Sequence, residues 1–222
     1  MAYIGTYPTP GRGGKSQSTD VLSQYENEGS SREERVPSMD AWPIWNYQEG
    51  QSIRVVCYTN AAKARLELNG KTIGQTKNYD QETGIIYWDI PYKDGKLEVV
   101  GLDNGDKEVS RYAIQSSKAP HTLSIQRGEK EISKDNGLAQ IVVQVVDENG
   151  VPVMLSDNEV TCQIAGPAKL LGLEASNNQD MSDYTDNIHR VYHGRLIAYI
   201  QATGEAGQVS IRFSAPWLKP VE

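Results

Sequence analysis

The stretch that decides the fold is Ala64-Arg-Leu-Glu-Leu-Asn-Gly-Lys-Thr-Ile-Gly74. Its first five residues alternate apolar with polar side chains, a period of two that is typical of a strand with one buried face. Asn69-Gly70 follows at once, and this dipeptide favours a tight hairpin turn because both residues tolerate a positive φ. Thr72-Ile73-Gly74 then has the pattern of a returning strand. The stretch therefore predicts an antiparallel hairpin.

The same pattern continues on both sides of this hairpin. About six short strands are expected between residues 51 and 117, separated by turn dipeptides such as Asp94-Gly95 and Asn104-Gly105. A second series of alternating runs follows the polar segment Ser116–Pro120. No window in either half sustains an apolar stripe of helical period. Many short strands at this spacing indicate an all-β chain that folds as two antiparallel β-sandwiches.

The chain is expected to have three parts. Residues 1–40 are predicted to be an irregular N-terminal segment, because Gly11–Ser18 is rich in turn residues and Glu26–Arg35 is charged with little to bury. A short helix around Val21–Tyr25 is weakly signalled. The first sandwich is expected over 41–118 and the second over 119–222.

Composition excludes several classes of function. The 222 residues include 22 Lys and Arg against 29 Asp and Glu, which gives a formal charge of −7 and argues against binding to nucleic acid. No apolar run approaches the ~18–20 residues needed to cross a bilayer, so no membrane insertion is expected. The first residues carry no pattern of a signal peptide. Cys57 and Cys162 each lie in an alternating run and are expected to be free, buried thiols.

No catalytic constellation is visible in the sequence, and no cofactor is expected. The dipeptide Asn158-Glu159 resembles a glycosidase acid/base motif by its letters alone, and a turn before a strand is the better interpretation. His121, His189 and His193 have no ligand-like spacing with either cysteine, and no CxxC motif is present. No serine lies in a GxSxG elbow. No metal site is therefore predicted.

The longest loop is predicted between Glu174 and His193, and long loops in compact domains are often functional. Its carboxylates and amides supply oxygen atoms of the kind that Ca²⁺ prefers, but without the spacing of an EF-hand. A solvated loop is the better interpretation. The oxygen-bearing residues are Asn177, Asn178, Asp180, Asp183, Asp186 and Asn187.

Four aromatic residues are candidates for binding carbohydrate, because an aromatic face suits the C–H face of a sugar ring. Trp42 and Trp45 precede the first predicted strand, and Tyr184 and Tyr192 lie in or next to the long loop. The alternative is structural, since aromatics just outside a sandwich often close its open end. Trp217 is expected to close the final strand.

Two segments carry a family resemblance. Residues 45–60 and 64–74 resemble the W-N-W, V-x-V-x-x-Y-T-N and L-x-L-N-G-K-x-x-G pattern of an accessory module in β-galactosidases of glycoside hydrolase family 2. Residues 139–153, 166–172 and 194–207 are similar to the module that often follows it. Where relatives often show G-V-G-N-G-D, this chain has Gly172-Leu-Glu-Ala-Ser-Asn-Asn.

The resemblance implies two tandem immunoglobulin-like sandwiches that form the non-catalytic C-terminal part of a longer glycoside hydrolase. An upstream catalytic barrel of the same polypeptide would be their partner, and the parent would be periplasmic or extracellular. Two alternatives remain at this point. The chain could be a carbohydrate-binding module, or it could carry Ig-like domains of a surface adhesin.

Overall fold

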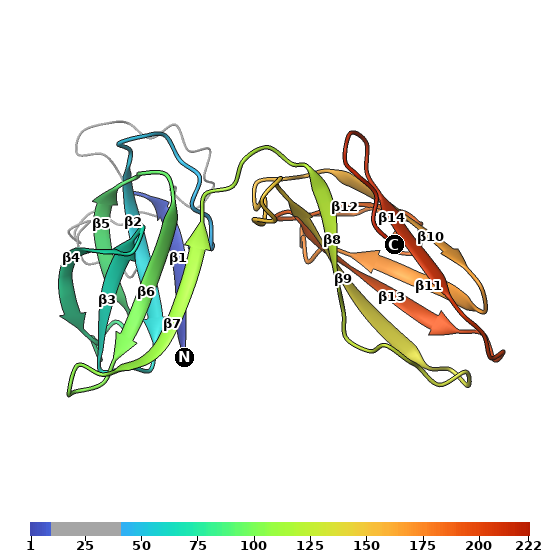
Figure 1. Cartoon of the computed structure of the whole chain (residues 1–222), viewed down its shortest axis with the longest axis horizontal. Coiled ribbons are helices and arrows are strands. Elements are labelled where there is room, and N and C mark those ends of the chain that lie inside the picture. The colour runs from blue at the N-terminus through green and yellow to red at the C-terminus, as the bar shows by residue number, and fades with distance from the viewer. Residues whose placement is uncertain (10–40) are drawn as a thin grey trace, which may run out of the picture. The chain divides into compact units, whose positions relative to one another are not determined.

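The computed structural model describes residues 1–9 and 41–222, which divide into two compact units, Met1–Ser116 and Ser117–Glu222. Each unit consists of strands in two antiparallel sheets (Figure 1). No helix occurs in these described residues, and so none is present that could span a membrane. The prediction of an all-β chain is confirmed. The weakly signalled helix at Val21–Tyr25 lies outside the described residues.

Unit 1 stacks a three-stranded sheet on a four-stranded sheet. The first sheet has the order β1-β2-β5, with β1 at Ala2–Pro8, β2 at Ser52–Thr59 and β5 at Ile86–Pro91. The second has the order β4-β3-β6-β7, with β4 at Lys71–Asn78, β3 at Lys63–Leu68, β6 at Lys96–Leu102 and β7 at Glu108–Gln115. The six strands expected between residues 51 and 117 are therefore present.

The predicted hairpin is β3 and β4. Asn69 and Gly70 both have a positive φ, of 52° and 74°, as a tight two-residue turn requires. Leu66 faces the core and is fully buried, while Glu67 beside it lies on the outer face of the sheet. The alternation seen in the sequence therefore corresponds to the two faces of β3.

The structure corrects the expectation that all of residues 1–40 are irregular. Ala2–Pro8 forms β1, which pairs along its whole length with β2, from Ala2 opposite Thr59 to Pro8 opposite Ile53. Ile4 is fully buried and Thr6 is nearly so, which means that β1 supplies part of the core. The strand is joined to the core by pairing with residues about fifty positions further along the chain, and composition alone does not reveal such a partner.

Unit 2 has the same kind of architecture. One sheet has the order β12-β10-β14, with β12 at Ile188–Arg190, β10 at Glu159–Ala165 and β14 at Ser210–Ser214. The other has the order β11-β13-β9-β8, with β11 at Ala168–Glu174, β13 at Arg195–Ala202, β9 at Leu138–Val146 and β8 at Thr122–Arg127.

Both cysteines are free and lie in the cores, as expected. Cys57 is on β2 in unit 1 and Cys162 is on β10 in unit 2. Burial raises the pKa of the Cys57 thiol to about 12 and that of Cys162 to about 11. These thiols therefore act as small apolar side chains.

Candidate functional site

The aromatic segment before β2 closes one end of unit 1. The ring of Trp45 packs edge-on against Tyr92 and Tyr47, with centroids 5.0 and 6.1 Å away. Its indole N–H donates a hydrogen bond to the carbonyl of Lys93 at 3.1 Å. Tyr47 is held in turn by Thr6 of β1, whose hydroxyl lies 2.7 Å from the phenol oxygen. Trp45 therefore fixes the segment to the core.

This arrangement corrects the candidate role of Trp45 in binding carbohydrate. The residue is only 1% exposed, so its ring offers no face for a sugar. Trp42, three residues earlier, is 41% exposed and lies beside Thr6 at the edge of β1. The structural interpretation of these aromatics holds for Trp45, and sugar binding at Trp42 stays a prediction.

Tyr184 and Tyr192 both belong to unit 2, and their ring contacts differ. Tyr184 is exposed and lies 5.9 Å from the ring of His189. Tyr192 is half-buried, packs against the core and meets the ring of His193 at 4.2 Å. Carbohydrate binding at these two residues also stays a prediction.

The oxygen-rich loop uses its side chains on its own backbone. Asp183 accepts hydrogen bonds from the amide and the hydroxyl of Thr185 at 2.8 and 2.7 Å. Asn177 and Asp180 accept bonds from the amides two residues further on, at 3.1 and 2.9 Å. Such turns are typical of Asp and Asn. Among the residues that the structure describes, no group of three or more His, Cys, Asp and Glu side chains is placed to hold a metal ion.

A Ser/His/Asp contact anchors the same loop and was not predicted from the sequence. His189 of β12 points inward beside Val160, and its side chain is almost fully buried. Its Nε2 lies 3.4 Å from Asp180 and its Nδ1 lies 3.3 Å from the hydroxyl of Ser182. Because a substrate has little access to the imidazole, this contact is suited to holding the loop. The sequence gives no sign that positions 180, 182 and 189 meet.

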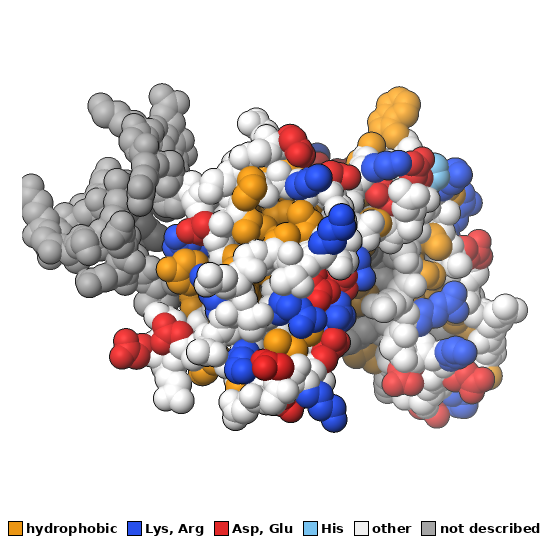
Figure 2. Space-filling view, turned by 60° about the vertical axis from the view of Figure 1, so that its left-hand side comes forward, with side chains coloured by type: hydrophobic (Ala, Val, Ile, Leu, Met, Phe, Trp, Pro, Cys, Tyr) orange, Lys and Arg blue, Asp and Glu red, His pale blue; other side chains and the backbone are white. Residues whose placement is uncertain are grey.

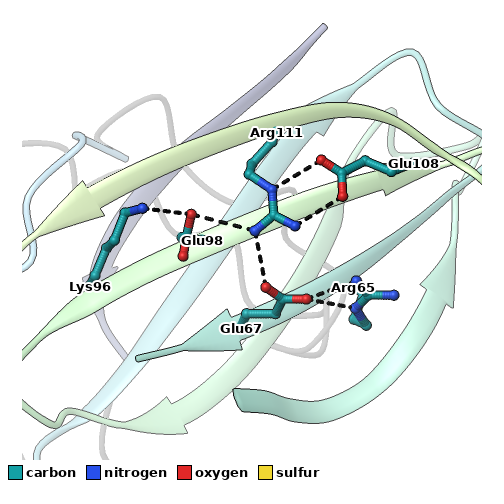
Figure 3. A network of polar contacts seen from close by, with 6 residues as sticks. All are labelled: Arg65, Glu67, Lys96, Glu98, Glu108 and Arg111. Atoms are coloured by element: carbon teal, nitrogen blue, oxygen red, sulfur yellow. Dashed lines mark hydrogen bonds and ion pairs between the residues drawn. The ribbon is translucent and has the colours of Figure 1, made fainter. Parts of the chain in front are cut away.

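The most extensive polar cluster described lies on the outer face of the sheet β4-β3-β6-β7 (Figure 3). Glu67 of β3 and Glu98 of β6 face each other directly across the two strands. Like charges in that position repel each other. Arg111 of β7 lies between them, with one guanidinium nitrogen 3.0 Å from Glu67 and 3.4 Å from Glu98. The arginine therefore compensates both carboxylates.

The remaining members of the cluster complete the pairing. Arg65 binds Glu67 at 2.8 Å and Lys96 binds Glu98 at 2.9 Å. Arg111 also makes two hydrogen bonds to Glu108, at 3.0 and 2.9 Å. Burial works to raise the pKa of Glu67, but the hydrogen bonds from Arg65 and Arg111 outweigh it and lower that pKa. A glycosidase acid needs a raised pKa, so the environment of Glu67 is the opposite of the one that acid catalysis requires.

The surface of unit 1 also has a shallow polar hollow of about 430 Å³ beside this cluster. It is lined by Lys63, Arg65, Thr76, Asn78, Leu102 and Asp106. Figure 2 shows hydrophobic side chains gathered in one area of the visible face, with Lys, Arg, Asp and Glu around them.

Trp217 differs from its expected role. It follows β14 in the turn Ala215–Leu218, and its side chain is fully exposed. Leu218, the next residue, packs against the core in its place. The final strand is therefore closed by Leu218, and Trp217 points into solvent.

Comparison with protein families gives two matches. Residues 123–222 match the model described as glycoside hydrolase family 2 C-terminal domain 5. Residues 50–110 match a domain of unknown function, DUF4982. The two matched ranges fall in unit 2 and unit 1 respectively.

Comparison with individual proteins gives matches to glycosidases. The chain is 25% identical over 202 residues to the β-galactosidase BoGH2A of Bacteroides ovatus, which covers 90% of this chain and 23% of that protein. A crystal structure of a β-glycosidase from Bacteroides vulgatus is 28% identical with a TM-score of 0.75, over 80% of this chain and 23% of that one. A family 2 member from Bacteroides cellulosilyticus shares the fold over 99% of this chain and 28% of that one, at 20% identity and a TM-score of 0.79. The chain thus spans about a quarter of the length of these proteins.

Proposed function

We propose that this chain, whose residues 123–222 match the model of a C-terminal domain of glycoside hydrolase family 2, is the non-catalytic accessory part of a β-galactosidase-like enzyme. Its two units would support the hydrolysis of carbohydrate by a catalytic barrel elsewhere in the same polypeptide. The match over nearly all of unit 2 is the observation that carries this proposal. The share of about a quarter that the chain covers in its relatives supports it.

The chemistry of the described residues supports a non-catalytic role for this chain. A glycosidase pair needs two carboxylates about 5–9 Å apart, one of them protonated to act as the acid. Glu67 and Glu98 face each other across β3 and β6, but Arg111 bridges them. A bridging cation favours the ionised form of a carboxylate, which is the opposite of what a general acid needs.

The first test uses the chain alone. We expect the purified chain to hydrolyse p-nitrophenyl β-galactoside no faster than buffer alone does. Turnover that disappears in a Glu67→Gln variant would show that the chain is itself an enzyme and would overturn the proposal. Glu129→Gln, a substitution on an exposed segment, is the matched control.

The second test uses the longer protein. The coding sequence upstream of Met1 should encode a catalytic barrel in the same reading frame. Deleting both units, residues 1–222, from that enzyme should lower its melting temperature or its kcat/KM, because docked domains stabilise each other. An enzyme with unchanged stability and activity after the deletion would contradict an accessory role.

The cellular location follows from the same proposal. We infer that the parent enzyme is periplasmic or extracellular, because hydrolysis of external glycans requires exposure to them. Fractionation of cells of the source organism, followed by detection of the enzyme with an antibody against this chain, tests the location. Detection only with cytoplasmic markers would contradict it.

A further inference from the structure

The dipeptide Asn-Gly occurs four times in the chain, each time in a connection between two strands. It is chemically labile, because glycine has no side chain to shield its backbone nitrogen, and that nitrogen can attack the side chain of the asparagine. All four asparagines are exposed, so access of water does not distinguish them. The four pairs are Asn69-Gly70, Asn104-Gly105, Asn136-Gly137 and Asn149-Gly150.

Deamidation at such a pair proceeds through a cyclic intermediate. The deprotonated glycine nitrogen forms a bond to the side-chain carbonyl carbon of the asparagine, and the side-chain amide leaves as ammonia. Water then opens the resulting succinimide at either of its carbonyl carbons, which gives aspartate or isoaspartate. The net reaction takes up water and releases ammonia, without oxidation or reduction. It therefore requires a carboxamide that can turn towards the nitrogen of the following glycine.

The carboxamide of Asn69 is held by the turn before β6. Its Oδ1 accepts a hydrogen bond from the amide of Lys96 at 2.8 Å, and its Nδ2 donates one to the carbonyl of Asp94 at 3.1 Å. Between these two partners lies Gly95, and a Cβ there would overlap the Asn69 carboxamide. A carboxamide that turns towards Gly70 loses both hydrogen bonds, so both must break before the ring can close.

The side chains of the other three asparagines are not held in this way. No hydrogen bond joins the side chain of Asn104, Asn136 or Asn149 to a residue that the structure describes. At these sites the glycine amide makes a hydrogen bond that the reaction must break. Gly105 donates to the carboxylate of Asp103 at 2.9 Å, Gly137 to the carbonyl of Ser133 at 2.9 Å, and Gly150 to the carbonyl of Asp147 at 3.0 Å.

The two reacting groups predict opposite orders of reactivity. Gly70 donates no hydrogen bond to any described residue, so a rate set by the freedom of the glycine nitrogen would make Asn69 the fastest site. A rate set by the freedom of the carboxamide would make Asn69 the slowest. The carboxamide should decide, because two hydrogen bonds must break at Asn69 and one glycine bond at each of the other sites.

We propose that Asn104, Asn136 and Asn149 are sites of spontaneous deamidation in the folded chain. Asn69 is protected by its contact with the turn before β6. Conversion of Asn69 would replace the donor that faces Asp94 by a carboxylate oxygen, and isoaspartate would also lengthen the main chain of the hairpin. The protection therefore lies where the change would disturb unit 1. This inference is independent of the accessory role.

The experiment follows the four sites in one sample of the native chain. The protein is kept in mildly alkaline buffer at physiological temperature, and samples taken over several weeks are digested and analysed by mass spectrometry. We expect aspartate and isoaspartate to accumulate at Asn69 about tenfold more slowly than at each of the other three sites, or more slowly still. Conversion of Asn69 as fast as any of the others would overturn the proposal, and so would the absence of conversion at all three.

Two further measurements separate the contact from the local sequence. In urea all four sites should convert at similar rates, because each is Asn-Gly and the fold no longer restrains it. Protection of Asn69 that persists in urea would overturn the proposal. In Gly95→Ala the new Cβ displaces the Asn69 carboxamide, so Asn69 alone should convert faster than in the native chain. An unchanged rate at Asn69 in the folded variant would also overturn it, and if the variant does not fold, the comparison within the native chain decides.

Discussion

The side chain of Asn69 joins the turn after β3 to the turn before β6, because it binds the backbone on both sides of Gly95. Its Oδ1 accepts a hydrogen bond from the amide of Lys96 at 2.8 Å, and its Nδ2 donates one to the carbonyl of Asp94 at 3.1 Å. Gly95 has a φ of 133°, and a Cβ on it would overlap the amide group of Asn69. The two turn dipeptides that the sequence marks as separate signals are thus one interlocked structure.

Asn69→Ala should destabilise unit 1 by about 1–3 kcal/mol, since it removes two hydrogen bonds and leaves a non-glycine residue at positive φ. Asn69→Gly keeps the backbone conformation and should cost less. Urea denaturation followed by tryptophan fluorescence measures both. Equal losses in the two variants would show that the hydrogen bonds alone matter.

Gly95→Ala should destabilise unit 1 by about 2 kcal/mol or more, because the new Cβ displaces the Asn69 amide and the φ of 133° is unfavourable for alanine. Gly95→Ala made in an Asn69→Gly background is the matched control, because it keeps the φ of 133° and removes the side chain that the new Cβ would meet. The difference between the effects of Gly95→Ala in the two backgrounds isolates the contact with Asn69. A difference near zero would contradict the interlock.

Asp147 should make unit 2 sensitive to acid. The carboxylate accepts hydrogen bonds from the amides of Lys118, Asn149 and Val151 at 2.9, 2.8 and 2.9 Å. Burial opposes its ionisation, but these bonds outweigh it and lower its pKa. The folded form therefore holds a proton less readily than the unfolded chain, whose Asp pKa is about 3.9. The stabilisation is complete above that pH and is lost as the pH falls through the folded pKa.

Asp147→Asn tests this dependence. The variant should be less stable than the native chain at pH 7, by about 1–3 kcal/mol, because the charge-assisted bonds are weakened. The difference in free energy of unfolding should shrink as the pH is lowered below ~4. Denaturant titrations at several pH values measure it. A difference that stays constant from pH 7 to pH 3 would show that the charge of Asp147 has no role.

Arg111→Met should destabilise unit 1 by about 1–3 kcal/mol, because Glu67 and Glu98 then face each other with one cation fewer between them. The pKa of Glu67 should rise in the variant, which NMR titration of the carboxylate detects. Lys134→Met removes an exposed pair with Asp135 and should change stability by less than ~0.5 kcal/mol. A similar effect of both substitutions would contradict the special role of Arg111.

The sequence predicts the strands of both units well, because each strand carries its own alternation and each turn its own Gly or Asn. The hairpin at Asn69-Gly70 is an example in which every signal is local. β1 was missed because its burial depends on β2, which follows about fifty residues later. The burial of Trp45 and the exposure of Trp217 could not be predicted from the sequence either. Burial of the first depends on packing against Tyr92, and exposure of the second depends on the φ of one turn residue.

The polar contacts of the candidate sites are less predictable than the strands, because they too depend on residues that lie far apart in the sequence. The facing of Glu67 and Glu98 follows from the register of β3 and β6, which the sequence does not specify to the residue. Likewise, His189 meets Asp180 and Ser182 only because β12 adds to the edge of β10. A three-residue strand carries too little pattern to be recognised in advance.

His189→Leu should loosen the loop between β11 and β12 while unit 2 stays folded. The substitution removes the contacts with Asp180 and Ser182 but keeps an apolar side chain of similar size facing the core. The loop is tied to the sheets by the amide of Leu173, which donates to the carbonyl of Tyr184 at 2.8 Å, and by that of Cys162, which donates to Asn187 at 2.8 Å. Both amides should exchange with deuterium faster in the variant, because local opening of the loop becomes easier. Tyr184→Phe, which removes only a long contact to Asp180 at 3.4 Å, should leave exchange unchanged. Equal exchange at Leu173 and Cys162 in His189→Leu and the native chain would show that the loop is held without the imidazole.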